Sequence, residues 1–483
     1  MHLRVPARFG KAAAVVTAAA VLAGCTGAAP VARRLDPPLP LSTVQDAGNR
    51  DGTSAPVADP IYPAYGNPAL DVLHYGLALT WSAQDRRLTG TATIRLRAVS
   101  AVQQVRLDFS PAYTLGNISV DGTSAAGRID GGDLVVDRAL PAGAAATLVV
   151  GYQGTPATVP MPSHRGDVEP LGLTVTAGGE LWTMQEPYGA STWYPSNDQP
   201  SDKALYDIAV TVPDGWAGVA SGTPDGVEGD TYRYKATTPV ASYLTTLAVG
   251  KYTRTEVQGP RGLPVVLWTR TGVDDQRLEA LRRAPEYLSW LERRFGAYPF
   301  PSAGVVVVPS RSAMETQQMV TIGGDVLSDD NAAAGVLLHE FAHQWFGDAV
   351  GPATWQDVWL NEGWATYTEA LFRADGDPAS MDRWERSARA ADADLRNRLG
   401  PPGHPTPDAF AESNVYVCPA LMLHQLHKDL GDARFFALGR AWAAAHTGTA
   451  LDRAAFVAFV KAQTGHDYSA LINAWLDSPT TPA

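Results

Sequence analysis

Residues 339–364 decide how this chain folds and read HEFAHQWFGDAVGPATWQDVWLNEGW. His339 and His343 are four positions apart, and the polar residues 329–331 can cap a helix that carries both of them. Positions i and i+4 share one helix face, so the two imidazoles can reach one metal ion. Glu340, one position round the helix, is then beside the open coordination position.

A third ligand is expected on the next predicted helix. Glu362 follows His343 with eighteen residues between them. Zinc accepts two imidazoles and a carboxylate and keeps one position for water. A short H-E-x-x-H match can arise by chance, but a chance match seldom lies on a helix that a second suitable helix follows. We therefore predict one Zn²⁺ held by His339, His343 and Glu362, with Glu340 as the general base.

The composition is that of a globular protein, because hydrophobic residues make up 45% and charged residues 18% of the 483 positions. The formal net charge is −12, and without the three basic residues of 1–24 it becomes −15. A body this acidic repels phosphate backbones, so we expect no nucleic-acid partner. It also repels anionic lipid, so a membrane attachment must be hydrophobic or covalent.

The N-terminus is typical of an export signal. Residues 1–24 combine basic residues with an apolar stretch that is too short to span a bilayer. They end in Leu-Ala-Gly before Cys25, which resembles the lipobox of bacterial lipoproteins and implies a lipid on Cys25. The expected location is the outer face of a bacterial cell membrane; the alternative is an ordinary cleaved signal and a secreted protein. The sequence has only one other cysteine, Cys418. If Cys25 carries a lipid, Cys418 has no partner, which excludes an internal disulfide framework.

The rest of the chain predicts a multi-domain α+β protein. Residues 25–60 are rich in Pro, Ala and Asp and predict a disordered tether. Residues 61–257 show short alternating stretches between glycine turns, which predicts an antiparallel β domain of saddle or sandwich type. Residues 258–483 predict a small mixed sheet that leads into a mainly helical domain. The expected helices cover 275–295, 331–348, 355–374, 378–398, 416–430, 432–446, 452–464 and 467–477.

The segments HEFAHQWFGD at 339–348 and WQDVWLNEGWATY at 355–367 resemble the gluzincin aminopeptidases, the family of aminopeptidase N and leukotriene hydrolase. The resemblance extends more weakly from about residue 65 to the C-terminus. It implies that the β domain is followed by a thermolysin-like catalytic domain. The chain stops soon after residues 474–476, where the catalytic domain of larger relatives would finish, so we expect a more open cleft.

The resemblance also implies two carboxylates that bind the α-amine of a substrate. Ala313-Met314-Glu315-Thr316 is similar to the family's Gly-Ala-Met-Glu-Asn strand, whose glutamate contacts the amine and whose backbone pairs with the peptide. Ser312 and Thr316 stand where glycine and asparagine are usual. The alternative is an ordinary edge strand with a solvated glutamate.

The second carboxylate is Glu186 in Met184-Gln185-Glu186-Pro187. It lies twelve positions before Asp198, as an acidic or amide residue does in the family. Met184 occupies a place where some members have glutamine, so one polar contact is expected to be missing. The alternative for Glu186 is a glutamate in a surface turn.

Tyr416 aligns with the family's catalytic tyrosine, which usually opens a Tyr-x-Lys-Gly-Ala motif. Cys418 and Pro419 replace the lysine and glycine here. A proline is tolerated in the first turn of a helix, so we expect the helix to begin at Tyr416. The alternative is a tyrosine that only packs at the start of a helix.

Together these residues predict a zinc aminopeptidase that acts on peptides with a free N-terminus. The departures at Ser312, Thr316 and Met184 keep a zinc endopeptidase or another metallohydrolase open. A non-catalytic surface binding protein is the third alternative, and it would predict damaged ligands or a lost base.

Overall fold

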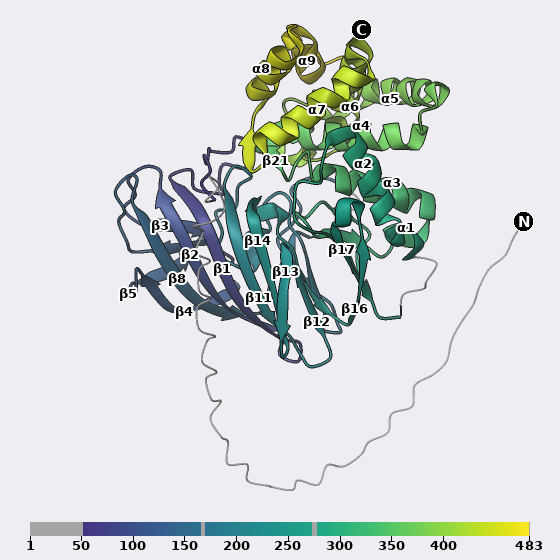
Figure 1. Cartoon of the computed structure of the whole chain (residues 1–483). Coiled ribbons are helices and arrows are strands. Elements are labelled where there is room, and N and C mark those ends of the chain that lie inside the picture. The colour runs from purple at the N-terminus through teal and green to yellow at the C-terminus, as the bar shows by residue number, and fades with distance from the viewer. Residues whose placement is uncertain (1–51, 166–169, 273–277, 483) are drawn as a thin grey trace, which may run out of the picture. The chain divides into compact units, whose positions relative to one another are not determined.

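The computed structural model describes residues 52–165, 170–272 and 278–482. Strands fill the first half of the described chain and helices the last third (Figure 1). This confirms the predicted order of a β-rich domain followed by a helical catalytic domain. The expected signal at 1–24 and Cys25 lie outside the described residues.

The largest sheet has eight strands in the order β13-β14-β11-β1-β2-β8-β4-β5. Its central strands β1 and β2 are long and pair antiparallel from Leu70↔Ala98 to Ser82↔Arg87. β1 also pairs with β11, and this pair is parallel, which corrects the expectation of a purely antiparallel domain. A long connection, not a hairpin, joins these two strands, so the antiparallel rule for short turns does not apply. The bounds are β1 Leu70–Ser82, β2 Arg87–Ala98, β4 Tyr113–Val120, β5 Thr123–Ser124, β8 Ala145–Gly154, β11 Lys203–Thr211, β13 Thr223–Glu228 and β14 Thr231–Ala241.

Two smaller sheets complete the β domain. One has the order β12-β15-β10-β9 and the other β3-β7-β6. β10 ends at Met184, and the next side chain, Gln185, is buried and donates its amide to the Ser242 and Thr245 carbonyls at 2.8 and 2.6 Å. These bonds fix the backbone just before Glu186. The bounds are β3 Val105–Asp108, β6 Gly127–Asp130, β7 Asp133–Val136, β9 Gly172–Val175, β10 Leu181–Met184, β12 Ala217–Ala220 and β15 Leu247–Gly250.

A mixed five-stranded sheet opens the catalytic domain, in the order β16-β17-β18-β20-β19. All of β16 except its last residue, Gln258, falls in the β domain expected over 61–257, yet the strand pairs with β17 along its whole length. The sheet change therefore falls between Gly250 and Tyr252. β19 is an edge strand that pairs with β20 through Ala313↔Ile322 and Met314↔Thr321. The bounds are β16 Tyr252–Gln258, β17 Pro264–Arg270, β18 Ala303–Val308, β19 Ala313–Met314 and β20 Val320–Gly323.

The helices follow the predicted order, with several corrected bounds. α3 ends at His343 and not at 348, and α4 begins at Trp359, after a separate 3-10 turn over Trp355–Asp357. The helix expected over 275–295 is described as two pieces, α1 and α2, because the chain leaves the helical path at Arg283; α2 then begins at Ala284 with Pro285 in its first turn. α6 begins at Ser413, so Pro419 lies inside the helix and not in its first turn. The bounds are α1 Glu279–Arg282, α2 Ala284–Phe295, α3 Asp330–His343, α4 Trp359–Ala374, α5 Pro378–Leu399, α6 Ser413–Leu430, α7 Asp432–His446, α8 Arg453–Thr464 and α9 Ser469–Asp477, with the two-stranded sheet β21 Val350–Pro352 and β22 Thr449–Leu451.

Pro419 has a packing role that explains Gly363 in the Asn-Glu-Gly motif. A Cβ placed on Gly363 would lie 2.8 Å from the Pro419 Cβ, which is closer than side chains approach. The missing side chain lets α4 and α6 come together, and these two helices carry Glu362 and Tyr416. A proline in a helix interior lacks one backbone donor, and here its ring fills the space above the glycine.

The β domain and the catalytic domain are joined by buried polar contacts. Lys203 Nζ donates to the Asp348 carbonyl at 2.7 Å, and the Trp355 amide donates to the Asp59 carboxylate at 2.6 Å. Asp59 belongs to the expected tether at 25–60, so the last part of that segment is packed against the protein and is not a free linker. In the part of the chain that the structure describes, every helix is too short or too polar to cross a bilayer.

Candidate active site and metal centre

The two histidines of the predicted motif lie together on the last turns of α3. Asp329 caps the helix by accepting the Ala332 amide at 2.8 Å. The rings of His339 and His343 face the same side, with centroids 4.8 Å apart. The four-residue spacing thus produces the shared face that the sequence predicted.

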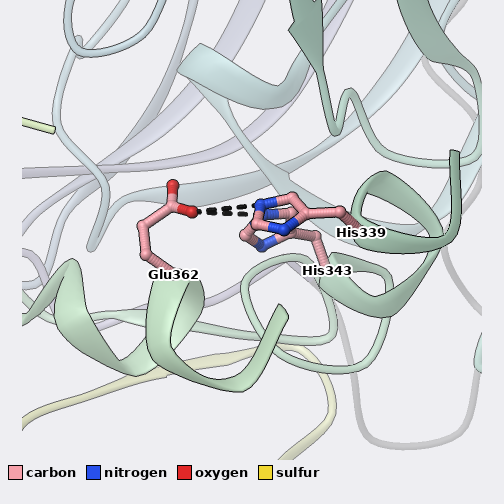
Figure 2. Close-up of side chains that lie close together, drawn as sticks. All are labelled: His339, His343 and Glu362. Atoms are coloured by element: carbon pink, nitrogen blue, oxygen red, sulfur yellow. Dashed lines mark hydrogen bonds and ion pairs between the residues drawn. The ribbon is translucent and has the colours of Figure 1, made fainter. Parts of the chain in front are cut away.

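Glu362 from α4 points at both imidazoles (Figure 2). Its Oε2 lies 3.3 Å from His339 Nε2 and 3.5 Å from His343 Nε2. Tetrahedral zinc with bonds of about 2.0–2.1 Å places its donor atoms about 3.4 Å apart. Both distances match this spacing, and one ligand atom from each of the three side chains lies within 4.8 Å of the others, so they would hold the ion through these atoms.

The outer nitrogen of each imidazole faces an oxygen atom, with Nε2 on the side of the metal position. His343 Nδ1 lies 3.2 Å from the Phe346 carbonyl, and His339 Nδ1 lies 3.7 Å from Glu369 Oε2. Glu369 in turn accepts a bond from Arg373 Nε at 2.7 Å. Such partners fix the tautomer of a ligand histidine and raise its basicity. Glu369 thus lies behind His339, on the side away from the metal position.

Glu340 is buried beside the metal position. One of its carboxylate oxygens lies within 4.8 Å of both the Glu315 carboxylate and a His343 nitrogen. Burial raises the pKa of Glu340 to about 7, against the opposing charges of His339 and His343. A carboxyl of that pKa can accept and return a proton near neutral pH.

Two further carboxylates converge on the same cavity, and both are those predicted to bind an amine. Oxygens of Glu186, Glu315 and Glu362 lie within 4.8 Å of one another. Glu186 Oε1 and Glu315 Oε1 are buried and have no hydrogen-bond partner among the described residues. Burial raises the pKa of both carboxyls, and their mutual repulsion raises that of Glu186 further. Buried anions without partners are costly, so this arrangement favours a cationic ligand.

Tyr416 from α6 closes another side of the site. Its ring stacks on His339 with centroids 6.0 Å apart. Burial raises the pKa of Tyr416 well above its usual value, although the charge of Arg165 acts in the opposite direction. The phenol is therefore protonated at neutral pH and can donate a hydrogen bond.

The structure shows what surrounds each of the three residues that depart from the family pattern. Thr316 is buried and bonds the Met319 carbonyl and the Thr321 hydroxyl, so it holds its own loop instead of reaching the cavity. Met184 lines the cavity and offers no polar contact there. Ser312 also lines it, next to the edge strand β19.

The cavity itself measures about 300 Å³ and contains residues that sequence reasoning missed. Arg165 and Arg311 carry charge into it, and Met161, Leu171, Val326 and Val336 form apolar parts of its wall. None of them belongs to a spaced motif, so no sequence signal marked them. His424 and His427 lie outside this cavity, and each has its Nδ1 within hydrogen-bond distance of the Tyr367 hydroxyl, at 3.1 and 2.7 Å.

Comparisons with known proteins agree with this fold and site. Residues 279–475 match the Peptidase family M1 domain. Aminopeptidase N of Acetobacter pasteurianus is 27% identical over 315 residues, which cover 61% of this chain and 88% of that protein. Aminopeptidase N of Streptomyces lividans is 26% identical over 331 residues, which cover 62% of this chain but 38% of that longer protein.

Solved structures extend the likeness to nearly the whole described chain. The M1 zinc metallopeptidase of Deinococcus radiodurans matches with a TM-score of 0.76 at 28% identity, covering 89% of this chain and 98% of that one. A mutant of that enzyme bound to a Tyr-Ser-Ala substrate matches with a TM-score of 0.77 at 28% identity, covering 89% and 99%.

The fold and the donor set define a zinc metallopeptidase with one metal ion. Residues 279–475 match the peptidase family M1 domain, and the relatives and solved structures support the gluzincin aminopeptidase family for this chain. It is a zinc aminopeptidase, as its sequence predicted.

Proposed function

We propose that this zinc aminopeptidase removes single residues from the N-terminus of peptides, and that Glu186 and Glu315 recognise the α-ammonium group. The pair of buried carboxylates with unpartnered oxygens beside the metal position carries this proposal. A bound ammonium would neutralise them and set the scissile bond one residue from the N-terminus. The Tyr-Ser-Ala peptide of the Deinococcus neighbour supports a short peptide as the substrate class.

The substrate backbone pairs with β19 in this proposal. β19 is an edge strand whose Ala313 and Met314 bond β20 on one side only among the described strands. An extended peptide can add to such an edge by main-chain hydrogen bonds. This addition would align the first peptide bond along the cavity.

The chemistry then follows from the side chains around that bond. A zinc ion held by His339, His343 and Glu362 would supply Lewis-acid chemistry at this bond: it would polarise the scissile carbonyl and lower the pKa of water at the site. Glu340 accepts a proton from the attacking water while the new C–O bond forms at the carbonyl carbon. Glu340 returns this proton to the amide nitrogen as the C–N bond breaks. Tyr416 donates its O–H to the carbonyl oxygen, where negative charge develops.

Two substrates that differ only in N-terminal acetylation test this function. The free peptide should be cleaved after its first residue, and the acetylated peptide much more slowly. Glu340→Gln should keep its zinc and lose about 10²- to 10⁴-fold in kcat, the usual contribution of a positioned general base. Preferred cleavage of the acetylated peptide, or normal turnover by the zinc-loaded variant, would reject the proposal.

We further propose that the chain is exported and held at the outer face of the cell membrane by a lipid on Cys25. The support is the N-terminal sequence alone, in which a short apolar stretch ends in Leu-Ala-Gly before this cysteine. Mass spectrometry of the mature N-terminus tests it. An unacylated Cys25, or cleavage at another position, would remove the anchor and leave a secreted enzyme.

A further inference from the structure

Arg165 reaches the active site from the β domain and contacts the proposed catalytic tyrosine. Its Nη1 donates to the Tyr416 hydroxyl oxygen at 3.2 Å, and its guanidinium carbon lies 6.0 Å from the centre of the Tyr416 ring. The two residues are 251 positions apart in the chain. Among the described residues, no other hydrogen bond to the Tyr416 side chain occurs.

The direction of this hydrogen bond follows from the chemistry of the guanidinium group. An arginine side chain has five N–H donors and no acceptor, so the Tyr416 oxygen must accept. The phenol has a single O–H, which then cannot point at Arg165. The proton is left to point into the cavity, where a carbonyl oxygen of the substrate would lie. Without the guanidinium, the hydroxyl can turn its proton toward other acceptors in the cavity.

The acceptors that compete for this proton are numerous. The carboxylates of Glu186, Glu315 and Glu362 line the same cavity as Tyr416, and Arg165 is a cation in the wall of that cavity. A fixed cation at this point therefore opposes the negative field of the site at the place where an oxyanion would form.

We propose that Arg165 is a positioning residue that holds the Tyr416 hydroxyl in the orientation that donates to the carbonyl oxygen of the substrate. This inference rests on the proposed function of the site. Because the oriented bond strengthens as negative charge develops, its loss lowers kcat more than it raises KM. Arg165 itself does not touch the reacting atoms in this scheme.

A double-mutant cycle on the zinc-loaded full chain tests the inference with an aminoacyl substrate. The variants are Arg165→Met, Tyr416→Phe and the double variant, with Arg165→Lys as a partial rescue. Arg270→Met is the matched control, because Arg270 makes a comparable bond to Glu180, at 2.8 Å, between two β-strand regions outside the cavity. Zinc content and thermal unfolding confirm that each variant is folded and loaded.

We expect Arg165→Met to lower kcat about tenfold or more, as loss of a hydrogen bond involving a charged group does, and to change KM by less than about twofold. In the Tyr416→Phe background the same substitution should have little further effect, since the two residues act as one unit. Arg165→Lys should recover part of the lost kcat, and Arg270→Met should match the wild type.

The inference would be overturned if the double variant lost kcat by the product of the two single-variant factors, because the two residues would then act independently. It would also be overturned by a rise in KM alone, which would assign Arg165 to the amine-binding carboxylates, or by wild-type kcat in Arg165→Met. Failure of the proposed function is separate, because then the wild-type enzyme would not release N-terminal residues at all.

Discussion

Replacing Glu315 by glutamine separates recognition of the substrate amine from catalysis. The amide keeps the size of the side chain but removes the charge that would meet the α-ammonium. Glu315 is only 4% exposed, so water screens its interaction weakly. Its Oε1 has no partner among the described residues, and the ammonium is therefore expected to be its main polar contact.

The size of the effect follows from that burial. A hydrogen bond between charged groups contributes about 1.5–3 kcal/mol net, which corresponds to about 10- to 150-fold in kcat/KM. The Coulomb energy of an isolated, buried carboxylate–ammonium pair would be larger than this, but it overestimates the loss for Glu315→Gln. Removing the Glu315 charge also relieves its repulsion with Glu362, which raises the pKa of Glu315 in the native enzyme.

The assay compares kcat/KM for a free peptide and its N-acetylated form. Glu315→Gln should lower the value for the free peptide by the factor above and leave the acetylated one within about twofold, because the latter brings no ammonium. Glu340→Gln serves as the contrast, since loss of the general base slows both substrates. An equal loss on both substrates in Glu315→Gln would refute the amine-binding role of this carboxylate.

Other expectations concern the metal, stability and the buried thiol. Glu369→Ala should weaken zinc binding about 10- to 100-fold in a chelator competition, because it removes the partner of His339 Nδ1; unchanged affinity would mean that the partner is dispensable. Arg396→Ala should cost about 3–5 kcal/mol in urea unfolding, since it leaves the fully buried Asp392 carboxylate without its cationic partner; a loss below about 1 kcal/mol would contradict this. Burial raises the pKa of the Cys418 thiol, so raising the pH from about 7 to about 9 should leave it protonated and unreactive toward iodoacetamide until denaturant is added. Rapid labelling of the native protein in peptide mapping would show that the thiol is accessible.

Local sequence was sufficient for the zinc site because its geometry is local. The i, i+4 spacing of His339 and His343 sets a shared face on any helix, and the cap at Asp329 starts that helix. Predicting Glu362 as the third ligand required only a second helix at a suitable distance along the chain. The β-rich first half and the succession of helices could also be predicted, since periodicity reports which face of an element is buried.

Other features depended on segments that are distant in the chain. β16 pairs with β17 across the boundary that was expected at residue 257, because strand pairing depends on a partner that alternation does not identify. The start of α6 was also misplaced. Pro419 is tolerated within the helix beside Gly363, a contact between two helices that no local pattern contains.

The sequence alone was thus sufficient to predict the metal, three candidate ligands and a candidate base, because helical spacing brings these side chains together within a few turns. The resemblance to a known family added Glu186, Glu315 and Tyr416 as candidates. Only the tertiary structure placed both glutamates at one cavity with unpartnered oxygens and set Arg165 against Tyr416. Residues that are 251 positions apart meet through packing of two domains, and this packing leaves no periodic trace in either segment.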